Sequence, residues 1–495
     1  MRQLSKSKII AFRQCPKRLW LEIHRPELRD DSGSEIAFSI GNQVGDIAHT
    51  IYDPEKRGLL IEIDQLGWES SFTTTSDWLQ KQDAPLFEAA LRIPGALALA
   101  DVMLPIKHDG EFLWHMIEVK SSTGVKDYHH DDIAVQAYIA QESGVPLKKI
   151  SLAHVDNTFV YPGGGNYQGL LKEVDLTEEV TTRTGEVTTW LTEAQAIAAQ
   201  SEEPEIEPGP QCYSPFTCGF CTHCIPKEDL SDYPLTSFSN LRAVKRKALE
   251  ADGYLDVRDV PPGQLSATNI RIQEQTIKGE AYFDQEGAAA DLNQYPGEPR
   301  FLDFETIAFA VPIWIGTRPY QQLPFQFSLH HRDSTGKIHH HEFLYTSGED
   351  PRRLMAVALI ETCGTAGPIF AYNASFERRV IKELSQQFTE HAEALNAIVD
   401  RIADLLPIAR NRYYHPSQHG SWRLKAILPA ICPELSYGDL DEVQDGSLAQ
   451  QAYLEAINPE TPPTRREEIQ KQLLNYCKLD TFALVRIWES FSNIQ

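Results

Sequence analysis

Two charged side chains near the end of an apolar, strand-like segment could carry hydrolytic chemistry. Residues two apart on a strand point to the same face, so Glu118 and Lys120 in residues 113–120 are expected to emerge together. The strand-like segment before it, residues 96–104, presents Asp101 in an otherwise apolar run. Two carboxylates and a lysine at neighbouring strand ends can hold Mg²⁺ or Mn²⁺ and orient a water molecule against a phosphodiester. The alternative interpretation is a set of ordinary surface ion pairs.

Two helical segments supply further polar groups. Gly45 and His49 are four residues apart and would share one face of a helix, where the imidazole can add a metal ligand. Gln136 lies in residues 131–138, a predicted helix soon after the strand that carries Glu118. In this order, the series Gly-x3-His, Asp, Glu-x-Lys and Gln resembles the RecB-like branch of the PD-(D/E)XK nucleases.

The resemblance covers residues 1–225 and implies a nuclease fold that cleaves phosphodiester bonds in DNA. The metal ligands that it implies are His49, Asp101 and Glu118. Lys120 would stabilise negative charge or orient water, and Gln136 would belong to the catalytic set.

The cysteines are distributed unevenly and indicate a second metal centre. Four of the eight lie close together, and another stands alone near the N-terminus in a predicted helix: Cys212, Cys218, Cys221 and Cys224, with Cys15. In an intracellular chain such a cluster indicates metal binding rather than disulfides. The four clustered cysteines could form a local zinc site, which would leave Cys15 without a role.

The cysteine spacing also resembles that of RecB-like nucleases with an iron–sulfur cluster, including the CRISPR-associated exonucleases. These take one ligand from the N-terminus and three from beyond the nuclease core. The resemblance implies a [4Fe–4S] cluster with Zn²⁺ as the alternative, held by Cys15, Cys212, Cys218 and Cys224, with Cys221 as a further candidate ligand.

A second set of acidic residues lies in the C-terminal part of the chain. Asp303 and Glu305 alternate on a strand-like segment, so both carboxylates are expected on one face. Tyr476 and Asp480 are one helical turn apart in the predicted helix of residues 473–491. Each of these patterns is common by itself.

A third segment lies between these two in sequence: Glu377 follows an apolar strand, residues 368–371, and begins a helix. Taken in order, the three segments resemble the DEDD exonucleases of the RNase H-like superfamily, in the branch that carries a tyrosine. The resemblance implies that Asp303, Glu305, Glu377 and Asp480 hold two metal ions, that Tyr476 positions the water, and that cleavage proceeds 3′ to 5′. This family usually has aspartate where Glu377 stands, and Asp404 is another candidate for that carboxylate.

A chain of 495 residues is too long for one ordinary core. Alternating strand and helix patterns predict an α/β protein: a PD-(D/E)XK nuclease fold with an iron–sulfur cluster in residues 1–225, a small adaptor domain in residues 226–299, and an RNase H-like exonuclease fold in residues 300–495. A Glu/Pro-rich connector, residues 201–210, marks the end of the first domain. Residues 241–251 predict a helix in the adaptor, which contains the basic run Arg242–Lys247.

The formal net charge of −24 argues at first against a nucleic-acid partner. Clustered carboxylates are required in a metal-dependent nuclease, however, and basic residues need only line the substrate channel. No apolar run approaches the roughly 20 residues of a membrane span, so we expect no membrane partner and a cytoplasmic location.

The sequence therefore predicts a metal-dependent DNA nuclease with two active sites, acting as an exonuclease on single-stranded ends. The alternatives are a non-catalytic or singly active iron–sulfur protein that binds nucleic acid, and an exonuclease acting on RNA. The whole architecture resembles a bacterial family known mainly as a domain of unknown function. DNA repair and phage defence, with a helicase or a defence system as partner, are compatible with it.

Overall fold

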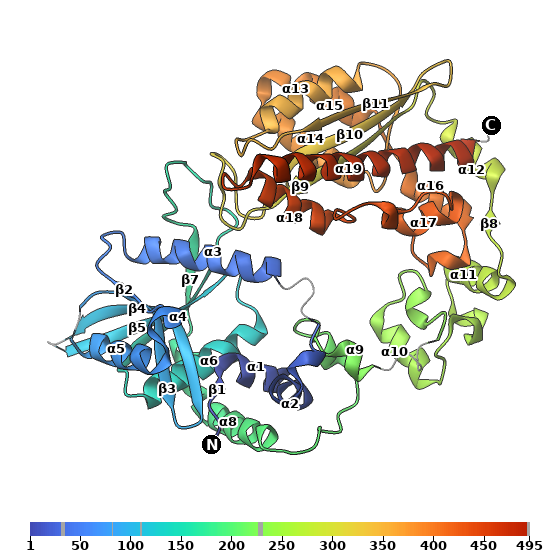
Figure 1. The fold of residues 1–495 in the computed structure, drawn as a ribbon. Helices are drawn as coiled ribbons and strands as arrows, with labels where there is room; N and C mark the ends of the chain where they lie inside the picture. The colour runs from blue at the N-terminus through green and yellow to red at the C-terminus, as the bar shows by residue number, and fades with distance from the viewer. Residues whose placement is uncertain (31–34, 82, 109–110, 226–230, 493–495) are drawn as a thin grey trace. The chain divides into compact units, whose positions relative to one another are not determined.

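The computed structural model describes residues 1–30, 35–81, 83–108, 111–225 and 231–492. Its architecture is mixed α/β, and about half of the residues lie in helices. The chain divides into two compact units (Figure 1). The first comprises Met1–Asp229 and Phe309–Gln321, and the second comprises Leu230–Ala308 and Gln322–Gln495.

The first unit contains a mixed sheet in the order β2-β3-β4-β5-β6-β7, with β1 paired to β4. The pairs β1–β4, β2–β3 and β5–β6 are parallel, and the others are antiparallel. Its strands are β1 Leu4–Ser5, β2 Leu59–Leu60, β3 Leu86–Ile93, β4 Ala96–His108, β5 Glu111–Lys120, β6 Leu147–Val155 and β7 Leu171–Asp175. Its helices are α1 Lys6–Gln14, α2 Pro16–His24, α3 Glu35–Tyr52, α4 Ile63–Leu66, α5 Trp68–Lys81, α6 Asp127–Glu142, α7 Thr177–Thr182, α8 Thr184–Ala198 and α9 Cys221–Cys224.

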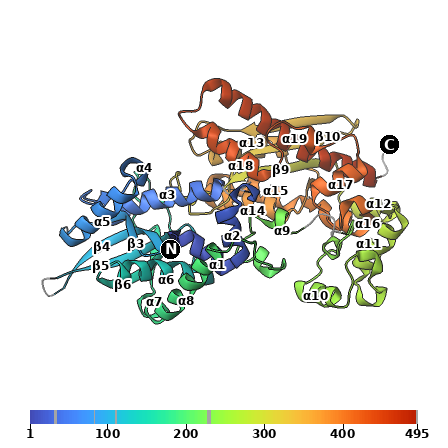
Figure 2. The same ribbon diagram turned by 60° about the horizontal axis from the view of Figure 1, so that its bottom comes forward.

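Helices cover both faces of this sheet. Figures 1 and 2 show α3 along one face and α6 with α8 along the other. Because alternate residues of a strand face opposite sides, Val102 and Ile117 pack on the side of α3, whereas Met103 and Met116 pack with α6. Strands buried on both faces explain why most residues of 96–104 and 113–120 are apolar.

A segment distant in sequence completes the core of the first unit beside α3. Residues 309–321 connect two strands of the second unit, yet Ala310 and Val311 pack against Val44 and Val155. The backbone N–H of Tyr161 donates to the carbonyl of Thr317 at 3.0 Å. No motif in the sequence marks this segment.

The second unit contains a five-stranded sheet in the order β11-β10-β9-β12-β13, together with the small pair β8–β14. β9 pairs antiparallel with β10 and parallel with β12. Its strands are β8 Tyr282–Phe283, β9 Arg300–Ile307, β10 Leu323–Arg332, β11 Ile338–Leu344, β12 Ile369–Ala371, β13 Ile402–Asp404 and β14 Tyr413–Tyr414. Its helices are α10 Ala243–Ala251, α11 Ala267–Lys278, α12 Gln285–Leu292, α13 Arg352–Cys363, α14 Ser375–Gln387, α15 Ala392–Asp400, α16 Leu405–Arg412, α17 Leu424–Ile431, α18 Gly446–Ile457 and α19 Pro463–Ser492.

Both faces of this second sheet are covered as well. Leu302 and Phe304 of β9 pack with α13, α14 and α15, whereas Phe301 packs with α19 on the opposite face (Figure 1). Asp303 and Glu305 have the same parity as Phe301, so β9 presents them on the side of α19. Residues of the predicted adaptor, such as Leu235 and Ile272, belong to the same hydrophobic cluster as Phe301.

The strands and helices predicted around the candidate site residues are confirmed as β4, β5, α6, β12, α14 and α19. The predicted helix at Cys15 is wrong: this residue is extended, with φ −162° and ψ 123°, and separates α1 from α2. Pro16 explains the break because the residue before a proline is pushed out of the helical region, while proline itself suits a helix start. In the described part of the chain, no helix has both the length and the apolar character needed to cross a membrane.

Candidate active sites

In the first unit, a cavity of about 790 Å³ brings together most of the predicted nuclease residues. Side chains from α3, β4 and β5 line it, among them His49, Asp101, Glu118 and Lys120. A further carboxylate, Glu88 of β3, lines the same cavity and was not predicted. The order of these strands in the sheet explains the convergence, since β3, β4 and β5 are consecutive neighbours.

Glu118 is the best-buried carboxylate of this group, with 2% of its surface exposed. Its Oε1 accepts hydrogen bonds from Lys120 Nζ and from Lys6 Nζ, each at 2.7 Å. Its Oε2 is buried and has no hydrogen-bond partner among the described residues. The two oxygens of Glu118 therefore differ: two ammonium groups hold Oε1, whereas Oε2 makes no hydrogen bond with a described residue.

Lys6 is the second residue that sequence reasoning missed. Its ammonium group also donates to Gln136 Oε1 at 2.5 Å and lies 3.5 Å from Asp132 Oδ1. Burial lowers the pKa of Lys6, but the charges of Asp132 and Glu118 outweigh it and leave the pKa raised. Gln136, predicted as catalytic, thus contacts the site through Lys6, from a fully buried position on α6.

Two other carboxylates are held where a negative charge is unfavourable. Burial, and then the charge of Glu118, raises the pKa of Asp101 well above its usual range. Asp101 Oδ2 accepts the backbone N–H of Val119 at 2.7 Å. Burial and Glu118 also raise the pKa of Glu88, whose φ is +53°. A non-glycine residue in this backbone conformation is strained, and such strain is concentrated at functional sites.

His49 completes the lining from α3. Its ring packs against Phe87, with ring centroids 4.5 Å apart, and burial lowers the pKa of the imidazole. The neutral imidazole is the form that binds a metal ion. Glu118, Asp101, Glu88 and His49 thus line one cavity, and carboxylate oxygens and imidazole nitrogens are atom types that can bind Mg²⁺ or Mn²⁺.

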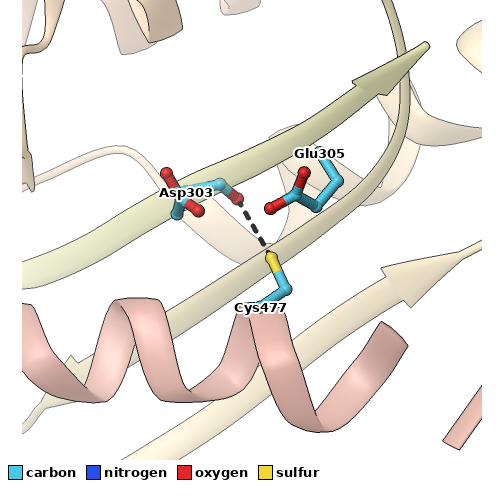
Figure 3. A group of neighbouring side chains, drawn as sticks. All are labelled: Asp303, Glu305 and Cys477. Carbon is cyan, nitrogen blue, oxygen red and sulfur yellow. Dashed lines mark hydrogen bonds between the residues drawn. The ribbon is translucent and has the colours of Figure 1, made fainter. Parts of the chain in front are cut away.

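In the second unit, β9 and α19 bring a second group of ligand atoms together. The carboxylate oxygens of Asp303 and Glu305 and the sulfur of Cys477 lie within 4.8 Å of one another. Figure 3 shows Cys477 reaching from α19 toward β9, with its sulfur facing the strand near both acidic residues. Cys477 Sγ donates to the backbone carbonyl of Asp303 at 3.9 Å.

Cys477 is a weaker candidate ligand than the two carboxylates beside it. Burial, and then the charges of Asp303 and Glu305, raises the pKa of its thiol well above the ordinary value. The neutral thiol is a poor ligand, since metal ions bind the thiolate, and Mg²⁺ and Mn²⁺ prefer oxygen. Cys477 is completely buried, as is common for a free cysteine.

Neighbouring acidic side chains disfavour the charged forms of Asp303 and Glu305 in this second site. Burial raises the pKa of Asp303 well above its usual range, and Asp480, Glu305 and Glu377 raise it further. Burial also raises the pKa of Glu305, and it raises that of Asp480 to about 6. Buried carboxylates so close together need a compensating positive charge. Asp303 of β9 is therefore near enough to Glu377 of α14 and Asp480 of α19 for both charges to raise its pKa.

The middle carboxylate is Glu377, which stands on α14 with 2% of its surface exposed. Burial, followed by the charge of Asp404, raises its pKa to about 8, and its Oε2 is buried without a hydrogen-bond partner in the described structure. Asp404 is engaged elsewhere, because its Oδ1 accepts the backbone N–H groups of Leu406 and Asn373, each at 3.0 Å. Glu377 is thus better placed than Asp404 to bind a cation.

Two tyrosines stand beside Asp480. Tyr476 was predicted, and burial and the charge of Asp480 raise the pKa of its hydroxyl, which stays protonated. Tyr437 was missed: its hydroxyl donates to Asp480 Oδ1 at 2.5 Å. The ammonium group of Lys425 lies 5.3 Å from the ring centre of Tyr437 and 5.7 Å from that of Tyr476. Nothing in the sequence marks Tyr437, which stands 43 positions before Asp480.

All five cysteines of the predicted cluster line one small cavity: Cys15, Cys212, Cys218, Cys221 and Cys224. The backbone orders them locally, since the N–H of Cys218 donates to the carbonyl of Cys212 at 2.8 Å. Burial raises the pKa of Cys224 to about 11, although the charge of Lys17 opposes this. The break between α1 and α2 allows Cys15 to reach residues almost 200 positions away in sequence.

Comparison with known families assigns a description to part of the second unit together with the segment 309–321 of the first. Residues 300–423 match the family described as Domain of unknown function (DUF2779). The match includes Asp303, Glu305, Glu377 and Asp404, and it ends before Tyr476 and Asp480. No curated protein matches the chain.

Removal of the Tyr437 hydroxyl tests how the second site is built. Tyr437→Phe removes a hydrogen bond that lowers the pKa of Asp480, so that pKa should rise above about 6 and weaken metal binding. A hydrogen bond to a charged group contributes about 1.5–3 kcal/mol, so half-maximal cleavage should require roughly tenfold more Mn²⁺. Tyr453→Phe is the control, because Tyr453 is buried and its hydroxyl has no partner among the described residues. Equal Mn²⁺ requirements of the two variants would contradict the role of Tyr437.

Proposed function

We propose that the chain is a metal-dependent DNA nuclease with two active sites, acting as an exonuclease on single-stranded ends. The observation that carries the proposal is a group of buried carboxylates in the second unit. Oxygen atoms of Asp303 and Glu305 lie within 4.8 Å of each other on β9, and the charges of Asp480, Glu305 and Glu377 raise the pKa of Asp303. Such an arrangement is unfavourable for a merely structural purpose and is suited to divalent cations.

In the proposed second site, Asp303, Glu305, Glu377 and Asp480 would hold two divalent ions. Bound there, such ions lower the pKa of water and offset the negative charge that develops at the cleaved phosphate. Tyr476 remains protonated and can donate a hydrogen bond that orients the attacking water. Tyr437 keeps one oxygen of Asp480 fixed by its hydrogen bond. Lys425 can offset negative charge beside both tyrosine rings.

In the proposed first site, Glu118, Asp101, Glu88 and His49 would hold the metal ion, which supplies an activated water and a compensating charge. Lys120 donates to Glu118 Oε1 and also to Asp132. The charges of Glu118 and Asp132 keep its pKa raised against burial, so its ammonium group can stabilise an anionic transition state. Lys6 donates to the same oxygen of Glu118.

The finer fold assignments belong to the same proposal. In the first unit, mixed strands carry the acidic residues and α6 supplies Gln136, as expected of a RecB-like PD-(D/E)XK nuclease. In the second, the central strand β9 carries two carboxylates and α19 carries the tyrosine and the last aspartate, as expected of an RNase H-like exonuclease.

The cysteine cavity supports a [4Fe–4S] cluster as a structural part of the first unit. The donor set fits, because thiolates are the usual ligands of such clusters, and one cavity collects a cysteine from each end of the unit. The cluster would tie the break between α1 and α2 to residues 212–224.

Substitution of Cys15 distinguishes this cluster from a local zinc site. Cys15→Ser should remove most of the absorbance at about 400 nm that an iron–sulfur protein shows, and should lower the iron content in parallel. Cys363→Ser is the matched control, because Cys363 is buried on α13, far from the cavity in sequence. A colourless protein that retains zinc in both variants would instead establish the zinc site.

Strands blocked at one end or the other test the nuclease proposal. Purified protein is incubated with labelled single-stranded DNA or RNA and with Mg²⁺ or Mn²⁺. Metal-dependent shortening of DNA from a free end is expected, and a block at the attacked end should prevent it. If only RNA is degraded, the chain is an RNA exonuclease rather than a DNA exonuclease. If all strands stay intact under every condition, the proposed catalytic activity is refuted.

One observation favours a singly active enzyme as the second candidate. Glu377 is one methylene longer than the aspartate expected at this position, and its pKa is raised to about 8. A partly protonated middle carboxylate weakens the second metal position. Glu377→Asp should then increase cleavage by the second unit, whereas a fully active site would lose activity with the shorter side chain.

A further inference from the structure

A polar cavity of about 330 Å³ in the second unit is lined by residues from α10, from the start of α11 and from α16. Three of its lining side chains are cations: Arg242, Lys245 and Arg410. Arg242 and Lys245 are exposed, whereas Arg410 is half-buried. The basic run identified in the sequence therefore contributes to a defined cavity.

The charge of this cavity is opposite to that of the chain. The sequence has 70 acidic and 46 basic residues, yet no carboxylate is among the described residues that line the cavity. Arg242, Lys245 and Arg410 make no ion pair with any carboxylate in the described ranges. By contrast, Arg246 on the same helix pairs with Glu250 at 3.4 Å. Surface cations in an acidic chain are usually neutralised by neighbours, so three unneutralised cations around one cavity indicate an anion.

Hydrogen-bond donors face the same space. Ser266 caps α11, and Thr268 and Asn269 in the first turn line the cavity with it. The first N–H groups of a helix lack partners within the helix, and a helix of 12 residues favours an anion at this end. Arg410 Nε is buried and has no hydrogen-bond partner among the described residues. An unpaired buried donor is costly, and an anion would relieve that cost.

We propose that this cavity binds a phosphoryl group, either a backbone phosphate of the strand or the phosphate of a free nucleotide or phosphate ion. Hydroxyl and amide donors around three cations suit the tetrahedral, multiply charged oxygens of phosphate. If the ligand is a backbone phosphate, the cavity positions the nucleic-acid strand. This part of the inference rests on the proposed function. Binding can be measured without cleavage, so the two proposals fail separately.

Strand binding is measured by fluorescence anisotropy with a labelled single-stranded oligonucleotide in EDTA, where no metal-dependent cleavage takes place. Arg242→Gln/Lys245→Gln should weaken binding roughly tenfold and reduce the salt dependence of log Kd by about 0.7 for each lost phosphate contact. The matched control is Arg246→Gln/Lys247→Gln, which removes the same charge from α10 at positions outside the cavity lining. Arg410→Lys, which keeps the charge but loses the guanidinium donors, should weaken binding less than Arg410→Gln.

Calorimetric titration with inorganic phosphate and with a mononucleotide identifies the source of the phosphoryl group. Loss of strand binding in the cavity variants, with no titration by either small ligand, assigns the cavity to a backbone phosphate. If inorganic phosphate or the mononucleotide binds saturably, and only the cavity variants lose this binding, the cavity is assigned to a free phosphate. Equal effects of the cavity pair and the control pair, with no small-ligand binding, would overturn the proposal. A wild-type chain that binds no strand would refute the proposed function, while the calorimetric arm would still test the cavity.

Discussion

Replacing Asp303 by asparagine is expected to lower cleavage by the second unit about 1,000-fold and to raise the melting temperature of the metal-free chain by about 3 °C. The side chains are nearly the same size, so the substitution removes charge without creating a cavity. Loss of one ligand costs several kcal/mol of the stabilisation that a metal ion provides. The same loss relieves repulsion from Asp480, Glu305 and Glu377.

The stabilisation should depend on pH in a defined direction. Unfolded Asp303 loses its proton near its ordinary pKa of about 4, whereas the folded residue keeps it to a higher pH. Between these two values the unfolded state binds fewer protons, so the wild-type chain loses stability as the pH rises. The advantage of Asp303→Asn should therefore vanish near pH 4 and grow toward pH 8, as measured by thermal melts in EDTA.

Cys477→Ala is the control for Asp303→Asn, because it changes a neighbour of the group without removing a carboxylate. We expect it to retain cleavage within a few-fold. Both variants are assayed in a Lys120→Ala background, so that the first unit contributes nothing. A Cys477→Ala variant as inactive as Asp303→Asn would contradict the assignment of the carboxylates as the functional ligands.

Glu118→Gln is expected to abolish cleavage by the first unit and to destabilise it by about 3 kcal/mol. Glu118 Oε1 is 2.7 Å from both Lys6 Nζ and Lys120 Nζ, in a site where Glu118 has 2% exposure. Neutralising it leaves Asp132 to balance two buried ammonium groups. Breaking a buried ion pair from one side is costly because the remaining charge stays desolvated.

A surface ion pair of the same unit provides the comparison for Glu118→Gln. Glu186 pairs with Arg183 at 3.2 Å, and 55% of its side chain is exposed. Glu186→Gln should cost less than about 1 kcal/mol and leave cleavage unchanged. Urea denaturation followed by a probe in the first unit measures both. If Glu118→Gln and Glu186→Gln destabilise the chain by similar amounts, the ion pairs of Glu118 do not have the energetic cost expected of buried ones.

Local periodicity was enough to predict which side chains meet within one element. The spacing of two residues placed Glu118 with Lys120 and Asp303 with Glu305, and the helical spacing of four placed Tyr476 with Asp480. These rules rest on fixed backbone geometry, and the strands and helices that carry the residues are confirmed. The DUF2779 match likewise covers the strand of Asp303 and Glu305.

Contacts between elements that are far apart in the sequence could not be predicted from local periodicity. Lys6 meets Glu118 across 112 positions, and Tyr437 meets Asp480 across 43. Glu88 lies in a mostly apolar strand, and its negative charge there was the available signal. Residues 309–321 pack in the first unit because their apolar side chains fill the space beside α3, which no local pattern encodes.

Equilibrium binding of Mn²⁺, measured by the electron paramagnetic resonance signal of the free ion, tests whether the two carboxylate groups are metal sites. The wild-type chain should bind Mn²⁺ in two separable classes of site, of which Asp303→Asn removes one and Glu118→Gln removes the other. Wild-type protein that binds no Mn²⁺, or variants that bind as much as the wild type, would contradict the account.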